Sequence, residues 1–146
     1  MTQRPNYPFN IFVPNLLNIC IDNNDYEEVS GRMYHCYDHE PVIFDNIVEL
    51  IQAAEKVFDD ISFPQASTKT RSFIKKPDVY GKKPPKIVEQ PELLKQSGEK
   101  ATIITSVRFR QKSTWQGEFF QLETGKVETF SNMVDFIRKL DKVINE

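Results

Sequence analysis

An internal repeat constrains the fold of this chain more than any other feature of its sequence. Residues 30–60 align without a gap on residues 116–146 when the sequence is shifted by 86 positions, and seven of the 31 aligned pairs are identical. The identical pairs are Gly31/Gly117, Phe44/Phe130, Asn46/Asn132, Val48/Val134, Ile51/Ile137, Lys56/Lys142 and Val57/Val143. Because such a repeat corresponds to one supersecondary unit, the sequence predicts two copies of the same small fold.

Each copy is predicted to end in an amphipathic helix of about 14 residues. Apolar side chains recur with the spacing i, i+3, i+4, i+7 over residues 47–58 and again over residues 133–144, which places them on one face of a helix. Asn46 and Asn132 precede these runs. Asparagine is a preferred N-cap residue because its side chain accepts a hydrogen bond from a free amide of the first turn.

Upstream of each helix, the pattern changes to the period of two and the β-branched and aromatic residues that are typical of strands. These runs lie at residues 16–22, 29–37 and 41–44 in the first copy and at residues 102–110, 115–123 and 126–130 in the second. Each copy therefore has the order β-β-β-α. We predict an α+β fold of two β-β-β-α repeats, each an antiparallel sheet with one helix, packed as a pseudo-two-fold pair.

The strand pattern also predicts two apolar faces for each small sheet. Trp115 and Phe119 share one face of their strand, whereas Phe120 and Leu122 share the other. One helix covers only one face of a sheet, so the second face needs another cover. The other copy, a second chain as in a homodimer, or a ligand would supply it, and we favour the other copy.

Composition divides the chain into a first repeat with an N-terminal arm (1–60), a connector (61–101) and a second repeat (102–146). The connector holds five of the nine prolines, and its nine Lys or Arg against four Asp or Glu give it a charge of +5, which leaves −7 for the rest. A linker, a wrapping arm or a functional loop would explain such a segment. PELLKQ, beginning at Pro91, would suit a single helical turn.

Composition also excludes several classes of protein. Apolar residues make up 39% of the chain and charged residues 27%, a balance typical of globular proteins. No apolar run is long enough to span a bilayer, and the N-terminus lacks the pattern of a secretory signal. A formal net charge of −2 disfavours a protein that coats nucleic acid. With only two cysteines, the chain is expected to be cytoplasmic and to have no membrane partner.

One cluster resembles metal ligands, namely HCYDH at residues 35–39 together with Cys20. Strand alternation places His35 and Cys36 on opposite faces of the sheet, which opposes joint coordination of zinc. In the repeat, Cys36 aligns with the core residue Leu122. We therefore predict a core cysteine, two exposed histidines, no metal site and no disulfide.

The sequence contains no recognisable catalytic or cofactor motif. Nucleophile elbows, glycine-rich phosphate loops, dinucleotide fingerprints and HExxH patterns are absent. The chain has only two histidines, so general-base chemistry would depend on carboxylates. We predict no catalytic residues, no cofactor and no enzymatic activity.

The stretch RFRQKSTWQG (residues 108–117) is the most distinctive candidate for a binding site. Basic side chains alternate with phenylalanine and glutamine and then meet the single tryptophan, a combination suited to phosphate contacts, stacking or anion capture. Asp22, Asn24 and Val29 stand at the aligned positions of the first copy, so any such site is one-sided. The alternative is a solvated strand face with the tryptophan as a core anchor. The candidate ligand-binding residues are Arg108, Arg110, Gln111, Lys112, Trp115 and Gln116, with Lys69 and Arg71, which stand beside hydroxyls in the connector.

Residues 107–141 resemble, in the order of their elements, the three-strand-plus-helix DNA-binding domains of plant ethylene-response factors and of phage integrase arms. That resemblance implies sheet-borne arginines and a tryptophan that read the major groove. Glu118, Glu123 and Glu128 stand on or near the strands and depart from the basic strands of those domains. The same run and FNIFVPNLLNICID (residues 9–22) also resemble small uncharacterised bacterial proteins with an RQxxTWQG-type stretch, a resemblance that implies no particular activity.

The sequence thus favours a non-enzymatic binding or regulatory module that engages a protein or a small anionic ligand. Its expected binding surface is one sheet face together with the basic connector. The alternative hypothesis is a nucleic-acid-binding protein that uses the Arg/Trp strand of the second copy. Salt dependence separates the two, because the affinity for nucleic acid falls steeply with added salt.

Overall fold

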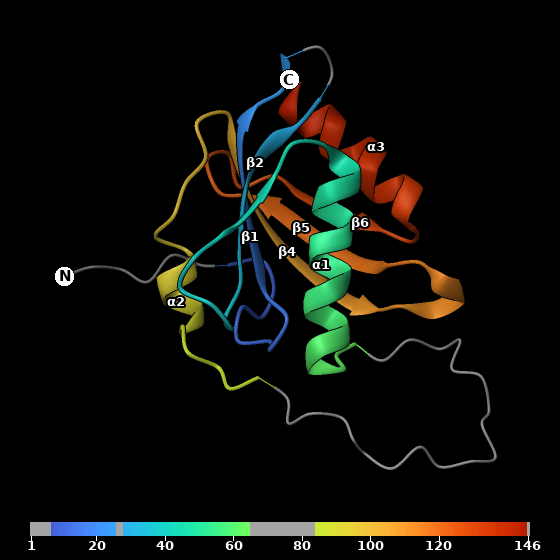
Figure 1. Cartoon of the computed structure of the whole chain (residues 1–146). Helices are drawn as coiled ribbons and strands as arrows, with labels where there is room; N and C mark the ends of the chain where they lie inside the picture. The colour runs from blue at the N-terminus through green and yellow to red at the C-terminus, as the bar shows by residue number, and fades with distance from the viewer. Residues whose placement is uncertain (1–6, 26–27, 65–83, 146) are drawn as a thin grey trace.

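The computed structural model of this chain describes residues 7–25, 28–64 and 84–145. These residues form an α+β fold with one six-stranded antiparallel sheet, in the order β3-β2-β1-β4-β5-β6, and three helices (Figure 1). The strands are β1 (Leu17–Asn23), β2 (Ser30–Tyr34), β3 (Val42–Phe44), β4 (Ala101–Phe109), β5 (Gln116–Gln121) and β6 (Val127–Phe130). The helices are α1 (Ile47–Ile61), α2 (Gln90–Leu93) and α3 (Met133–Ile144), and a 3-10 turn, η2, spans Gln111–Ser113.

The elements follow one another as three strands and a helix, then α2, then three strands and a helix. Each predicted strand and helix is present, with bounds displaced by up to three residues. The predicted turn of helix at Pro91 is α2, and the following strand begins at Ala101, one residue before the predicted boundary. The α+β class and the antiparallel pairing are therefore as predicted, but the structure has one six-stranded sheet where a separate sheet was predicted for each repeat.

The two central strands, β1 and β4, join the halves of the chain into a single sheet. Asn18 lies opposite Ile104 at the middle of this antiparallel pair. On either side of it, Leu17 lies opposite Thr105 and Ile19 lies opposite Ile103. The sheet therefore runs without interruption from β3 at one edge to β6 at the other.

The helices α1 and α3 both lie on one face of this sheet (Figure 1). Asn46 and Asn132 begin them with the same backbone conformation, φ −160° and ψ 172°. As predicted, the side chain of each asparagine accepts a hydrogen bond from a first-turn amide, that of Glu49 at 2.9 Å and that of Asp135 at 2.7 Å.

The larger hydrophobic core lies between the sheet and these two helices. Several of its buried side chains are aromatic, and each such residue contributes about 2 kcal/mol when it is fully buried. The core aromatic residues with at most 1% of their surface exposed are Phe44, Phe58, Trp115, Phe119 and Phe136.

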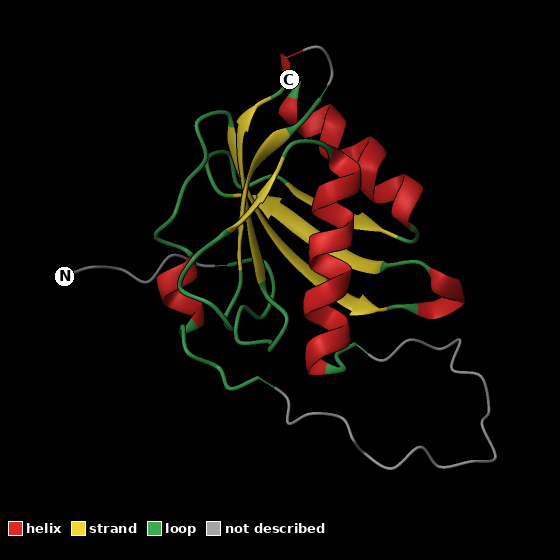
Figure 2. Ribbon diagram, viewed as in Figure 1, coloured by secondary structure: helices red, strands yellow, loops and turns green. Residues whose placement is uncertain are grey.

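The opposite face of the sheet is covered by other parts of the same chain and not, as we expected, by the other copy. Ile11 and Leu16 from the N-terminal segment and Leu93 from α2 form a second core there with Ile104 and Phe120. Figure 2 shows that these covering segments are loops apart from α2. The expectation was wrong because the halves join edge to edge, which leaves their second faces side by side and available to one common cover.

The predicted parity of the strands is correct. Trp115 and Phe119 lie in the core beneath the helices, whereas Phe120 and Leu122 belong to the opposite core. The alternation of β5 therefore serves two cores rather than one core and a solvated face.

Candidate functional site

Arg110, a predicted ligand-binding residue, lies inside the protein. It is 5% exposed, and its Nη1 donates hydrogen bonds to Glu55 Oε2 and Asp59 Oδ1, both at 2.8 Å. Its Nε donates to the carbonyl of Pro64 at 2.7 Å, and its guanidinium carbon lies 5.6 Å from the ring centroid of Phe58. Arg110 therefore fastens the end of β4 to α1.

Trp115 is also an interior residue, 1% exposed. Its ring meets Phe58 and Phe136 edge to face, with centroid distances of 5.6 and 5.4 Å, and its indole N–H donates to the Glu55 carboxylate. Aromatic pairs of this geometry add to the stability that burial provides. Trp115 thus acts as the core anchor that the sequence left open as the alternative.

Gln111 and Gln116 stabilise the turn between β4 and β5. The side-chain oxygen of Gln116 accepts from the Gln111 amide at 2.9 Å, and its nitrogen lies 3.2 Å from the Gln111 carbonyl. Arg108 is exposed and forms an ion pair with Glu118 on the neighbouring strand. These three predicted site residues are therefore engaged in local contacts.

The remaining predicted site residues lie on the surface or beyond the described ranges. Lys112 is exposed in the left-handed region of η2, with φ 56°. Lys69 and Arg71 lie outside the described residues. The structure thus brings Arg110 and Trp115 together on Glu55 and does not gather the predicted set around a ligand.

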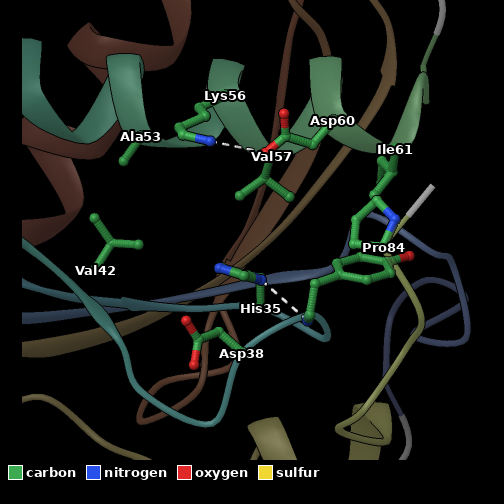
Figure 3. Close-up of a pocket in the computed structure, with 10 residues that line it drawn as sticks. His35, Asp38, Val42, Ala53, Lys56, Val57, Asp60, Ile61 and Pro84 are labelled. Atoms are coloured by element: carbon green, nitrogen blue, oxygen red, sulfur yellow. Dashed lines mark hydrogen bonds and ion pairs between the residues drawn. The ribbon is translucent and has the colours of Figure 1, made fainter. Parts of the chain in front are cut away.

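A cavity of about 280 Å³ lies between α1 and the connection from β2 to β3 (Figure 3). We call it the His35 cavity. Its apolar lining includes Ala53, Val57 and Ile61 of α1, with Val42 of β3 opposite them. Its volume is near the lower end of the range for small-molecule sites, about 300 Å³.

Four ionisable side chains also line the His35 cavity. His35 and Asp38 follow β2, and Lys56 and Asp60 belong to α1. Lys56 Nζ lies 3.0 Å from Asp60 Oδ2. Asp38 accepts a hydrogen bond from the Glu40 amide at 3.0 Å and has no ion-pair partner among the described residues. With a neutral imidazole, the four groups carry a formal charge of −1.

His35 is 8% exposed and presents a hydrogen-bond donor to the cavity. Its Nδ1 accepts from the Tyr37 amide at 3.1 Å, so Nε2 carries the proton of the neutral ring. In the described part of the chain, Nε2 has no hydrogen-bond partner, and it points between the connection and α1 (Figure 3). Burial lowers the pKa of His35 below 6.5, an effect that the charges of Asp38 and Asp60 oppose and that of Lys56 reinforces.

A second cavity, of about 310 Å³, lies on the other side of the same connection, against α2. Its lining includes His39, Ile87 and Glu92. Asp38 borders both cavities, whereas each of the two histidines of the chain lines only one of them. The two imidazoles can therefore report separately on the two cavities.

The two cysteines line neither cavity. Both are fully buried and free; burial raises the pKa of Cys20 to about 12 and raises the pKa of Cys36 above 9.0. Cys36 packs in the core against α2, as predicted, while His35 faces α1. No three His, Cys, Asp or Glu side chains of the described residues are grouped as metal ligands.

The sequence interpretation missed the burial of His35, which was wrongly predicted to be exposed. His39 is exposed, as predicted. The signal for burial was the strand parity, because His35 falls on the same side as Met33, which lies in the core beneath the helices. The helix α1 extends to Ile61 and covers this position after the strand has ended.

Comparison with known proteins adds no relative from which a function could be transferred. No protein-family model, no curated protein and no solved structure matches this chain. None of the helices described here combines the length and the apolar character needed to cross a bilayer.

Proposed function

We propose that this chain is a non-enzymatic binding module and that a small molecule binds in the His35 cavity. One observation carries the proposal, namely a buried imidazole whose Nε2–H points into a cavity without a partner among the described residues. Nε2 is not one of the fully buried polar atoms without a partner, which are Asn15 Oδ1 and Thr105 Oγ1 in the described part of the chain. The atom is therefore accessible from the cavity, where a ligand with a hydrogen-bond acceptor can reach it.

The protonation state of His35 favours binding over catalysis. Its basic nitrogen, Nδ1, is occupied by the Tyr37 amide, and burial holds its pKa below the usual value. A general base needs a free basic nitrogen within reach of its substrate, and its pKa should lie near the working pH. The imidazole is therefore suited to orient a ligand rather than to move a proton.

The site is proposed to belong to the first half alone. At the aligned positions of the second half, Gln121 and Thr124 replace His35 and Asp38. The Oε1 of Gln121 accepts a hydrogen bond from the Thr124 hydroxyl at 3.0 Å, within its own turn. Residues that only maintain the fold need not differ between the halves, and the difference supports a ligand on one side.

We further propose that the fold arose by duplication, with a pseudo-two-fold axis through the pair Asn18 and Ile104. These residue numbers differ by 86, the offset of the sequence repeat, and the two flanking pairs exchange partners under the same offset. The identical N-cap conformations of Asn46 and Asn132 also support it. In this proposal, duplication supplied the scaffold and later divergence supplied the site.

This proposal moves the ligand from the sheet face, where the sequence placed it, to the cavity. Both sheet faces are covered in the described part of the chain. The nucleic-acid hypothesis would use Arg108, Arg110, Lys112 and Trp115. The burial of Arg110 and Trp115 opposes it, because it removes two of these four residues from contact with a phosphate or a base. A cytoplasmic location remains part of the proposal, and the free thiols of Cys20 and Cys36 support it.

A fragment screen by NMR tests the binding proposal. Fragments are expected to shift the imidazole resonances of His35. Ala53→Leu fills the cavity from α1 and should lower the affinity of these fragments at least tenfold. Val134→Leu is the matched control, because Val134 is 64% exposed on α3 and should leave affinity unchanged. Fragments that bind the Ala53→Leu variant as well as the native chain, or a screen without shifts at His35, would contradict the proposal.

A further inference from the structure

We infer that the ligand of the His35 cavity is a small organic cation, an ammonium group with an oxygen acceptor beside it and a branched apolar body. This inference rests on the proposed function and names the chemical class of its ligand. Three features of the lining support it, namely the carboxylate of Asp38, which has no ion-pair partner among the described residues, the Nε2–H donor of His35, and an aliphatic wall.

The charges of the lining favour a cation over an anion. Lys56 is already paired with Asp60 at 3.0 Å, so the uncompensated charge of the lining is the carboxylate of Asp38. An anion at Lys56 would lie beside the carboxylate of Asp60 and would also face Asp38. An ammonium group gains an ion pair at Asp38 without breaking an existing one.

The Nε2–H donor of His35 excludes the ammonium group from the His35 side of the cavity. Because Nε2 carries a proton, it repels a second donor and needs an oxygen acceptor. The cation therefore belongs on the Asp38 side of the cavity, and a carbonyl or hydroxyl oxygen belongs beside His35. Since both residues stand on the same short connection, the two groups should be neighbours in the ligand.

The rest of the lining is aliphatic. Ala53, Val57 and Ile61 form one wall and Val42 stands opposite it (Figure 3). Such a surface favours a branched hydrocarbon body, because burial of each methylene group contributes about 0.8 kcal/mol. The volume of about 280 Å³ restricts the ligand to a small molecule.

L-Leucinamide has these three features and serves as the probe. 4-Methylpentanamide lacks only the ammonium group, and 4-methylpentanoate carries the opposite charge on the same hydrocarbon body. We expect L-leucinamide to bind about tenfold more tightly than 4-methylpentanamide and the carboxylate to bind most weakly. The readout is the imidazole resonance of His35, with His39 as the internal reference because it lines the other cavity.

Asp38→Asn tests the charge without changing the size of the side chain. In this variant the tenfold preference should disappear, so that L-leucinamide and 4-methylpentanamide bind with about the same affinity. Glu40→Gln removes the same charge two residues away, outside the lining of both cavities, and should keep the preference. Added salt should lower the affinity for L-leucinamide and leave the affinity for 4-methylpentanamide unchanged. This measurement tests the charge of Asp38 in the unmodified chain.

The outcomes separate this inference from the proposed function. Tighter binding of 4-methylpentanoate, or shifts confined to His39, would overturn the cationic class, while fragments that shift His35 would still uphold a binding site. Failure of every probe together with an empty fragment screen would overturn both. A tenfold preference that survives Asp38→Asn would also contradict the inference.

Discussion

In the first half of the molecule the residue that follows β2, His35, faces a cavity, whereas its counterpart in the second half, Gln121, is hydrogen-bonded to Thr124. The order of elements around the two residues is the same: His35 comes directly after β2, Gln121 is the last residue of β5, and each precedes a short strand and a helix. His35 presents its Nε2–H to a cavity, whereas Gln121 bonds Thr124 through Oε1 and lines neither of the two cavities beside the β2–β3 connection. The same order of elements thus carries a cavity-lining side chain in the first half and a turn-stabilising side chain in the second.

At the other end of each half, the second half is closely packed and the first half has a cavity. Arg110 and Trp115 of the second half are anchored on α1. Their counterparts, Asn24 and Val29, border a small cavity of about 80 Å³ near the ends of the helices. The shared spacing of apolar residues thus maintains the common scaffold. Single polar or aromatic residues determine where that scaffold is closely packed and where it contains a cavity.

The largest expected effect tests whether the halves are equivalent at their closest strand contacts. An added Cβ would lie 1.9 Å from the Cys20 carbonyl oxygen at Gly31 and 2.2 Å from the Ser106 carbonyl oxygen at Gly117. Gly31→Ala and Gly117→Ala should each lower the free energy of unfolding by about 3 kcal/mol or more, measured by urea denaturation. Gly125→Ala, with no atom within 4 Å but φ +75°, should cost only about 1 kcal/mol. A large loss at only one of the first two glycines would break the equivalence.

The next effect should appear in one half only. Arg110→Met removes one of the two donors to Glu55, leaving that of Trp115, and takes from the Pro64 carbonyl its bond to Nε. It should lower the free energy of unfolding by about 2–3 kcal/mol. Asn24→Ala is the aligned change in the first half. It removes an exposed hydrogen bond to Asn145 and should cost less than about 0.5 kcal/mol. Equal losses of stability in the two variants would show that the contacts of Arg110 with α1 stabilise the protein no more than the exposed hydrogen bond of Asn24 does.

The pH dependence of stability sharpens the comparison between His35 and Gln121. Because the folded pKa of His35 lies below 6.5, the unfolded chain binds a proton that the folded chain does not, between that pKa and 6.5. The free energy of unfolding should therefore fall as pH decreases through this window. His35→Gln, which installs the residue of the second half, should flatten the profile, whereas His39→Gln should not. Denaturation at a series of pH values checks this, and an unchanged slope in His35→Gln would disprove it.

The smallest effect concerns the cavity beside Val29. Val29→Ile adds one methyl group toward a space of about 80 Å³ that residues of both helices line and should raise the free energy of unfolding by about 0.5 kcal/mol. Val134→Ile, the same change at an exposed position, should leave stability unchanged. Thermal denaturation compares the two variants. A loss of stability in Val29→Ile would mean that this end of the first half is already closely packed.

Local pattern was enough to predict the elements of the fold. The caps at Asn46 and Asn132, the faces of β5 and the position of α2 depend on residues within a few positions of one another, and periodicity reports such relations directly. The candidate site was less predictable. Arg110 and Trp115 meet Glu55 across 55 and 60 positions of sequence, so their burial depends on where α1 crosses the sheet.

By itself, the sequence determined the α+β class, the order of strands and helices, the N-caps and the side of each strand on which a residue lies, because these follow from local spacing. Only the tertiary structure decided that β1 pairs with β4, since many registers satisfy the same alternation of side chains. That pairing placed α1 and α3 on one face and left the other to the N-terminal segment and α2. It also brought Arg110 under α1, and the packing of α1 over the end of β2 buried His35 beside a cavity.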